Sequence, residues 1–168
     1  MVWTSEKQVK YQQFAKHYIS TYSTKIDCAD LGIAALVDFS KKEKLPNRFK
    51  YYSSGWKWIN YSPSSDNADD FKANAMRMLG ALNIIDNTKK VPIGASKGGD
   101  FIMSRWNNSL GHTRVIHTVT PVKDKYKVVW YQGNLPAVIP EKREEFFSNI
   151  QGVFDKQPRR WNFEQFSE

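Results

Sequence analysis

The sequence predicts an α+β fold, in which helices come first along the chain and antiparallel strands follow. Apolar residues recur with the helical period of 3.6 in the first half, whereas short β-rich runs separated by turn residues occupy positions 100 to 132. The chain has 168 residues and 40% of them are hydrophobic, which suffices for one core. We therefore expect a single domain that spans residues 1–168.

The first two helices are indicated by their caps and their apolar residues. A helix is expected over Ser5–Tyr22, whose first residue forms a capping box with Gln8. A second helix should begin with Asp27 as its N-cap and stop before Pro46. Because residues 31–37 are apolar on all sides apart from one glycine, we expect the second helix to be the buried central one.

In the segments that follow, turn residues separate runs with the periodicity of strands or helices. The aromatic stretch 49–61 reads as a hairpin that turns at Ser53–Ser54–Gly55, and a third helix is expected from Ala68 to Leu82. Three strands are then predicted, over Asp100–Arg105, Thr113–Val119 and Tyr126–Gln132. After Pro140 we expect a final helix that buries Phe146, Phe147 and Ile150. The residues from Asp155 onward carry no clear signal.

Composition restricts the classes of partner and cofactor. The net charge of +8 favours anionic partners such as nucleic acid, anionic lipid or bacterial wall polymer. Its positive residues are spread along the chain, so neither a nucleic-acid module nor a membrane partner is expected. One cysteine and three histidines predict neither a disulfide nor a metal or other cofactor. Without a visible signal peptide or membrane span, we expect a chain that is cytoplasmic as made, is exported by a signal-independent route, or has lost its signal.

Cys28 and His112 are the candidate catalytic pair. Cys28 follows the predicted N-cap directly, where free backbone N–H groups and the helix dipole stabilise a thiolate. Most lone cysteines are small buried apolar residues, so this position alone is weak support. His112 opens a predicted strand, and an imidazole is the side chain suited to take a thiol proton near neutral pH.

A third residue should fix the orientation of the imidazole. If the turn after the His112 strand centres near residues 122–123, the position opposite His112 is Gln132 or Asn134. A slip of one residue would change which side chains face each other, and Asp124 in the turn is the carboxylate alternative. His117 is the substitute base should the segment at 111–113 not carry it.

Four segments resemble those of a known superfamily. DCADLGIAAL resembles the Asp-Cys-Ser-Gly-Leu motif of NlpC-type cell-wall peptidases, and GGDFIMSRW resembles their Gly-Asp-Leu-Val-Phe-Phe strand. GHTRVIHTV is similar to their Ser/Gly-His-Val-Gly-Ile strand, and YQGN stands where papain-like enzymes place a polar orienting residue. CHAP amidases share this order. The sequence departs from the pattern at Ala29–Asp30 and at Thr113–Arg114, and its insert between the matched blocks is long and aromatic.

The resemblance implies a papain-like fold, with N-terminal helices and a nucleophile-bearing central helix packed on an antiparallel sheet. It implies hydrolysis of an amide in peptidoglycan stem peptides by Cys28 and His112, with Tyr22 as an oxyanion donor, although a core tyrosine is the simpler interpretation. Trp56, Trp58 and Tyr61 would line a glycan-facing cleft or else pack in the core. By analogy with small basic enzymes of this kind, an antibacterial effector with a cognate immunity or inhibitor protein is expected. It is expected to act in the periplasm or cell wall.

Two alternatives stay open. The first keeps the papain-like fold but acts on proteins, as a protease, deamidase or acyltransferase. The second is a non-enzymatic basic binding module, in which Cys28 would be buried and unreactive.

Overall fold

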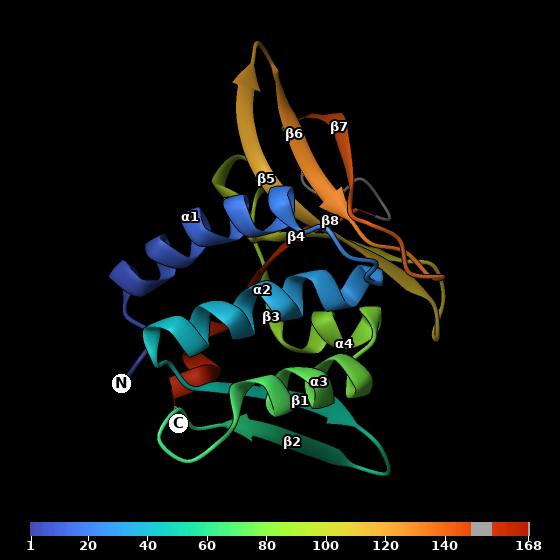
Figure 1. Cartoon of the computed structure of the whole chain (residues 1–168). Helices are drawn as coiled ribbons and strands as arrows, with labels where there is room; N and C mark the ends of the chain where they lie inside the picture. The colour runs from blue at the N-terminus through green and yellow to red at the C-terminus, as the bar shows by residue number, and fades with distance from the viewer. Residues whose placement is uncertain (149–155, 168) are drawn as a thin grey trace.

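The computed structural model describes residues 1–148 and 156–167 and shows an α+β fold with antiparallel sheets (Figure 1). The helices are α1 (Ser5–Thr21), α2 (Cys28–Glu43), α3 (Ala68–Met78) and α4 (Ala81–Asp86), with short 3₁₀ turns η1 (Ile93–Ala95) and η2 (Phe163–Ser167). The strands are β1 (Asn47–Tyr52), β2 (Trp56–Tyr61), β3 (Thr88–Lys90), β4 (Phe101–Arg105), β5 (Gly111–Val122), β6 (Lys125–Gln132), β7 (Glu141–Ser148) and β8 (Gln157–Trp161). Strands β1 and β2 form the predicted hairpin, and the others form a sheet of order β3-β8-β4-β5-β6-β7.

The two long helices begin with side-chain caps. Asp27 caps α2 as predicted, because its carboxylate accepts a hydrogen bond from the Asp30 N–H at 2.9 Å. The predicted capping box of α1 is wrong: Thr4 is the cap, and its hydroxyl accepts from the Lys7 N–H at 3.2 Å. Thr4 has the extended backbone that a cap requires, whereas Ser5 is already helical.

The predicted third helix is interrupted at Leu79 and Gly80. Leu79 is extended, with φ near −107°, and Gly80 caps the separate helix α4, where its N–H donates to the Asn83 side chain at 2.9 Å. Glycine is a poor helix former, so little is lost by ending α3 there. Leu79, at the break, and Ile84, in α4, are both buried in the core.

The expected final helix after Pro140 is also wrong, because this segment is strand β7. It pairs antiparallel with β6 along its whole length, from Gln132↔Glu141 to Lys125↔Ser148. Backbone pairing with β6 overrides the helical preference of its Glu, Lys and Arg residues. Alternation along the strand buries Phe147 but leaves Phe146 56% exposed. Ile150, also expected to be buried, lies outside the described residues.

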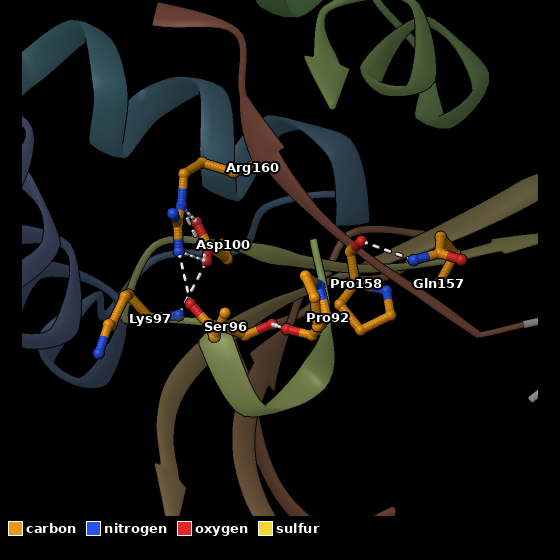
Figure 2. Close-up of polar contacts among 8 residues, drawn as sticks. Pro92, Ser96, Lys97, Asp100, Gln157, Pro158 and Arg160 are labelled. Carbon is orange, nitrogen blue, oxygen red and sulfur yellow. Dashed lines mark hydrogen bonds and ion pairs between the residues drawn. The ribbon is translucent and has the colours of Figure 1, made fainter. Parts of the chain in front are cut away.

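The C-terminal strand β8, which the sequence did not predict, lies inside the sheet between β3 and β4. Figure 2 shows how its Arg160 reaches Asp100, the residue just before β4. Asp100 is almost completely buried and accepts from the Arg160 guanidinium at 2.8 to 3.2 Å and from the Lys97 N–H at 2.8 Å. Arg160 also donates to the Ala95 carbonyl at 2.8 Å, so one ion pair fastens the tail to the turn that precedes β4.

Apolar side chains fill both faces of the sheet. The larger cluster lies on the helical side and includes most of α2 together with Phe101 and Val115. The smaller cluster, on the other face, includes Ile102, Ile116 and Trp130. Helix α2 approaches β4 so closely that a Cβ on Gly32 would lie 2.3 Å from the Phe101 ring. This contact sets the position of α2, and therefore of its first residue, relative to the sheet.

Candidate functional site

Cys28 is the first residue of α2 and lies at the edge of a cavity of about 650 Å³. Cys28 is partly exposed. Four segments line the cavity: the start of α2, the first residues of α4 with their cap, the β4–β5 turn with the start of β5, and the segment after β6. Its lining residues are Asp27, Cys28, Ala29, Gly80, Ala81, Leu82, Asn83, Trp106, Asn108, Ser109, Leu110, Gly111, His112, Asn134 and Leu135. A cysteine at a helix N-terminus beside a cavity is accessible to a substrate and faces free backbone N–H groups.

His112, the second residue of β5, lines the same cavity and is 8% exposed. Its Nε2 lies 2.8 Å from the Gln132 side-chain oxygen, and Trp106 stacks on its ring with centroids 5.9 Å apart. Because an amide oxygen can only accept, Nε2 carries the proton and Nδ1 keeps its lone pair. Burial lowers the pKa of His112; the bond to Gln132 opposes this shift, and the positive charge of Arg114 adds to it. The ring is therefore neutral at pH 7 and can act as a base.

Cys28 and His112 lie on different sides of β5: α2, with Cys28, packs on one face of the strand, and the His112 side chain projects from the other. The Thr113 hydroxyl donates to the Cys28 carbonyl at 2.5 Å, and Val115 packs in the helical-side cluster. Alternation along the strand places His112 on the other face, together with Ile116. Within residues 1–148 and 156–167, no hydrogen bond joins the Cys28 thiol to the His112 ring. Direct proton transfer therefore requires a movement that brings the two side chains together.

Gln132 and Asn134, the two predicted orienting residues, have different partners. Gln132 contacts the His112 ring, whereas the Asn134 side-chain oxygen accepts from the Leu135 N–H at 2.8 Å. Gly133, between them, sits so close to the start of α2 that a Cβ there would lie 2.4 Å from the Asp27 carbonyl oxygen. This close approach brings the end of β6 against the helix that carries Cys28, so that Asn134 lines the cavity.

The predicted alternatives lie elsewhere. Asp124 is exposed in the β5–β6 turn. His117 lies at an irregularity of β5, against the Tyr131 ring, and does not line the cavity; burial lowers the pKa of its imidazole. Tyr22 packs against Tyr18 and is not among the lining residues either.

The two expectations for Trp56, Trp58 and Tyr61, a shared cleft or core packing, are each met only in part, because the three residues lie on opposite faces of the β1–β2 hairpin. Tyr61 is buried against Phe71, while Trp56 and Trp58 are exposed. Strand alternation explains the split, since positions 56 and 58 share one face and position 61 belongs to the other.

Several site residues escaped the sequence reasoning. Trp106 and the α4 residues Leu82 and Asn83 line the cavity, and only Gly80, a helix-breaking residue, hinted at a bend there. Asp30 lies one helical position beyond the lining residue Ala29. One of its oxygens is buried without a hydrogen-bond partner among the described residues, and burial, with the nearby Asp27 charge, raises its pKa to about 7.

Comparison of the chain with protein-family models, with curated proteins and with solved structures gives no match. In the part of the chain that the structure describes, no three or more His, Cys, Asp or Glu side chains are grouped as a metal site. None of the described helices combines the length and apolar character that crossing a bilayer demands.

Proposed function

We propose that the chain is a cysteine hydrolase with a papain-like arrangement, which cleaves amide bonds in peptidoglycan stem peptides. The observation that supports this proposal is the shared cavity: the single cysteine, at the N-terminus of the central helix, and a histidine held by Gln132 both line it. An accessible thiol, a neutral imidazole and an orienting amide are the components that thiol hydrolysis needs.

The proposed reaction uses these groups in turn. His112 Nδ1 accepts the Cys28 proton, and the thiolate adds to the scissile carbonyl carbon to form a tetrahedral oxyanion. Backbone N–H groups in the first turn of α2 stabilise this oxyanion. The imidazolium then gives its proton to the leaving amine, and a thioester remains on Cys28. Water, deprotonated by His112, attacks the thioester and releases the carboxylic acid and the free thiol.

The thiol and the imidazole must meet for the first step. In ligand-free enzymes catalytic hydrogen bonds are often long and tighten only with substrate bound. The β4–β5 turn carries Trp106 above the His112 ring, with the indole 59% exposed. We propose that substrate entering the cavity displaces this turn and lets the His112 ring reach Cys28.

The substrate class rests on the motif resemblance and on charge. A protein of net charge +8 is attracted to an anionic wall polymer, although this attraction is not specific. An antibacterial effector of this kind would be neutralised by a cognate immunity protein that covers the cavity. Both statements are part of the proposal.

The decisive experiment incubates the purified protein with peptidoglycan and separates the soluble fragments by chromatography and mass spectrometry. We expect the wild type to release new muropeptides and Cys28→Ala to release none. Asp124→Asn, a change in an exposed turn remote from the cavity, serves as the matched control and should retain full activity. No fragments from the wild type, or equal release by Cys28→Ala, would remove the proposal.

A second candidate, a non-enzymatic binding module, is favoured by the lack of a thiol–imidazole hydrogen bond in the described residues. Iodoacetamide separates the two, because an activated thiolate is alkylated faster than an ordinary thiol. Fast labelling of Cys28 at pH 7 that slows in His112→Ala supports a hydrolase. Labelling at the rate of free cysteine in both proteins supports the binding module. If labelling is fast but peptidoglycan stays intact, a panel of protein substrates tests for a protease, deamidase or acyltransferase.

A further inference from the structure

The outer face of the β1–β2 hairpin combines exposed aromatic rings with cations. The pairs Arg48↔Asn60, Lys50↔Trp58 and Tyr52↔Trp56 all lie on this face, which we call the hairpin face. The Tyr52 and Trp56 side chains are 66% and 56% exposed, and their rings meet edge to face at 5.6 Å. Exposed rings in such a group are uncommon on a surface that has no partner.

The cations of the hairpin face lie directly over its indole rings. The Arg48 guanidinium is 3.9 Å from the centre of the Trp58 ring, and the Lys50 ammonium is 5.1 Å from that of Trp56. These cation–π contacts hold the charges among the rings rather than beside them. None of the six residues of the face is acidic. The face therefore suits a ligand that combines rings able to pack on aromatic side chains with negative charge.

The opposite face of the hairpin anchors it rigidly to the body of the molecule. Phe49 stacks on Phe71 at 5.8 Å, and Tyr61 packs on the same ring at 5.3 Å. The Lys50 backbone exchanges hydrogen bonds with the Asn87 side chain, the residue that ends α4. The first residues of α4 line the cavity that holds Cys28. One short helix thus connects the hairpin to the candidate site. In Figure 1 the turn between β1 and β2 lies on the same side of the view as the first turn of α2.

We propose that the hairpin face is a docking surface for an anionic glycan, namely the wall polymer whose peptide enters the Cys28 cavity. This proposal rests on the proposed function and names the part of the substrate that binds away from the cavity. Sugar rings pack on Tyr52, Trp56 and Trp58, while Lys50 attracts a carboxylate. The Asn60 amide is placed to hydrogen-bond hydroxyl or acetamido groups.

The ratio of charges to rings favours a glycan over single-stranded nucleic acid. The face offers three aromatic rings and two cations, and a wall glycan carries an acidic peptide stem on alternate sugars. Nucleic acid carries one phosphate per base, and proteins that bind single strands track the backbone with a continuous positive groove. The partly buried Asp86 carboxyl, close enough to Lys50 to interact with it, makes the area around the hairpin face less positive than such a groove.

The test measures binding without turnover. The full chain carrying Cys28→Ala is sedimented with insoluble peptidoglycan, alone and with Tyr52→Ala and Trp56→Ala added. We expect about tenfold weaker binding when both rings are removed, as for aromatic anchors at other interfaces. Phe146→Ala is the matched control, because Phe146 is an equally exposed aromatic residue on β7, and it should bind like the parent. Unchanged binding in the double variant would overturn the proposal.

A fluorescent single-stranded oligonucleotide and vesicles of anionic phospholipid are titrated in parallel. Tighter binding of either one, abolished by the same two substitutions, would assign the hairpin face to nucleic acid or membrane and overturn the glycan proposal. The test also separates the two hypotheses about this chain. Binding that depends on Tyr52 and Trp56 without any cleavage by the wild type would refute the hydrolase alone. Cleavage with binding that ignores these residues would refute the docking surface alone.

Discussion

Two polar clusters, one around Asp100 and one around Cys28 and His112, differ in how many of their polar groups have hydrogen-bond partners. Around Asp100, the carboxylate receives hydrogen bonds from Arg160 and from the Lys97 N–H, and Arg160 also bonds a carbonyl. Around Cys28, the thiol makes no hydrogen bond to any described residue, and His112 has one hydrogen-bonded nitrogen, Nε2, in the same part of the structure. A saturated cluster stabilises the fold, whereas unsaturated groups at a cavity remain available to a ligand. The predictions below test this division.

The largest expected effect is on the rate of the proposed hydrolysis and comes from a substitution in the cavity. If the proposed hydrolase reaction holds, His112→Ala should lower the turnover of peptidoglycan by about a thousandfold, since it removes the proposed general base. It should lower the free energy of unfolding by only about 1 kcal/mol, as a small loss of packing. Steady-state release of muropeptides and urea denaturation measure the two quantities. If stability collapsed while the rate per folded molecule held, His112 would belong with the structural cluster instead.

Asp100→Asn should show the converse pattern. Removal of the carboxylate leaves the Arg160 guanidinium, whose side chain is 27% exposed, without its ionic partner. We expect the free energy of unfolding to fall by about 3 kcal/mol, in the range found when one member of a buried ion pair is removed. The turnover per folded molecule should not change. A specific loss of turnover at unchanged stability would contradict the comparison.

The Gly32–Phe101 contact joins the two regions, because Gly32 lies one turn after Cys28 and Phe101 follows Asp100. Gly32→Ala should lower the free energy of unfolding by about 2 kcal/mol, since the new methyl group overlaps a fully buried ring. Denaturant unfolding of Gly32→Ala, Phe101→Leu and the double variant forms a cycle. A smaller side chain at 101 should relieve part of the loss. Strictly additive changes in the free energy of unfolding would show that residues 32 and 101 are not energetically coupled.

The structural features that could be predicted from the sequence are those set by residues close together in the chain. The Asp27 cap, and with it the place of Cys28 at a helix start, follows from local chemistry. The order of strands β4 to β6 was likewise readable from turns and β-rich runs. The contact of His112 with Gln132, one of the two expected partners, was readable from the alternation along the two strands. Which face of β5 packs against α2 was not, because long-range packing of the helices on the sheet decides it.

Long-range pairing explains the remaining errors. Strand β8 has partners about 55 to 75 residues earlier in the chain, in β4 and β3, and no local pattern announces them. Strand β7 has a composition that suits a helix, and only the edge of β6 makes it a strand. The ion pair between Asp100 and Arg160 depends on the same insertion of β8, so the structural cluster was harder to foresee than Cys28.

The smallest expected effect concerns Asp30, which shares features of both regions. It is partly buried like the structural cluster, yet one oxygen has no partner among the described residues. Its pKa is raised from an ordinary 3.8 to about 7, first by burial and then by Asp27. The folded state therefore binds a proton that the unfolded chain releases. Its contribution to stability is present below about pH 4 and is lost as the pH rises through 7.

Asp30→Asn should remove this pH dependence. Between pH 5 and 8 we expect the melting temperature of the variant, measured by circular dichroism, to decline less than that of the wild type. Asp124→Asn, with an exposed carboxyl, should leave the decline as it is. An unchanged slope in Asp30→Asn would mean that the carboxyl ionises freely in the fold. It would then carry a negative charge in the first turn of α2, where the proposed reaction places the oxyanion, and this turn would be a poorer site for it.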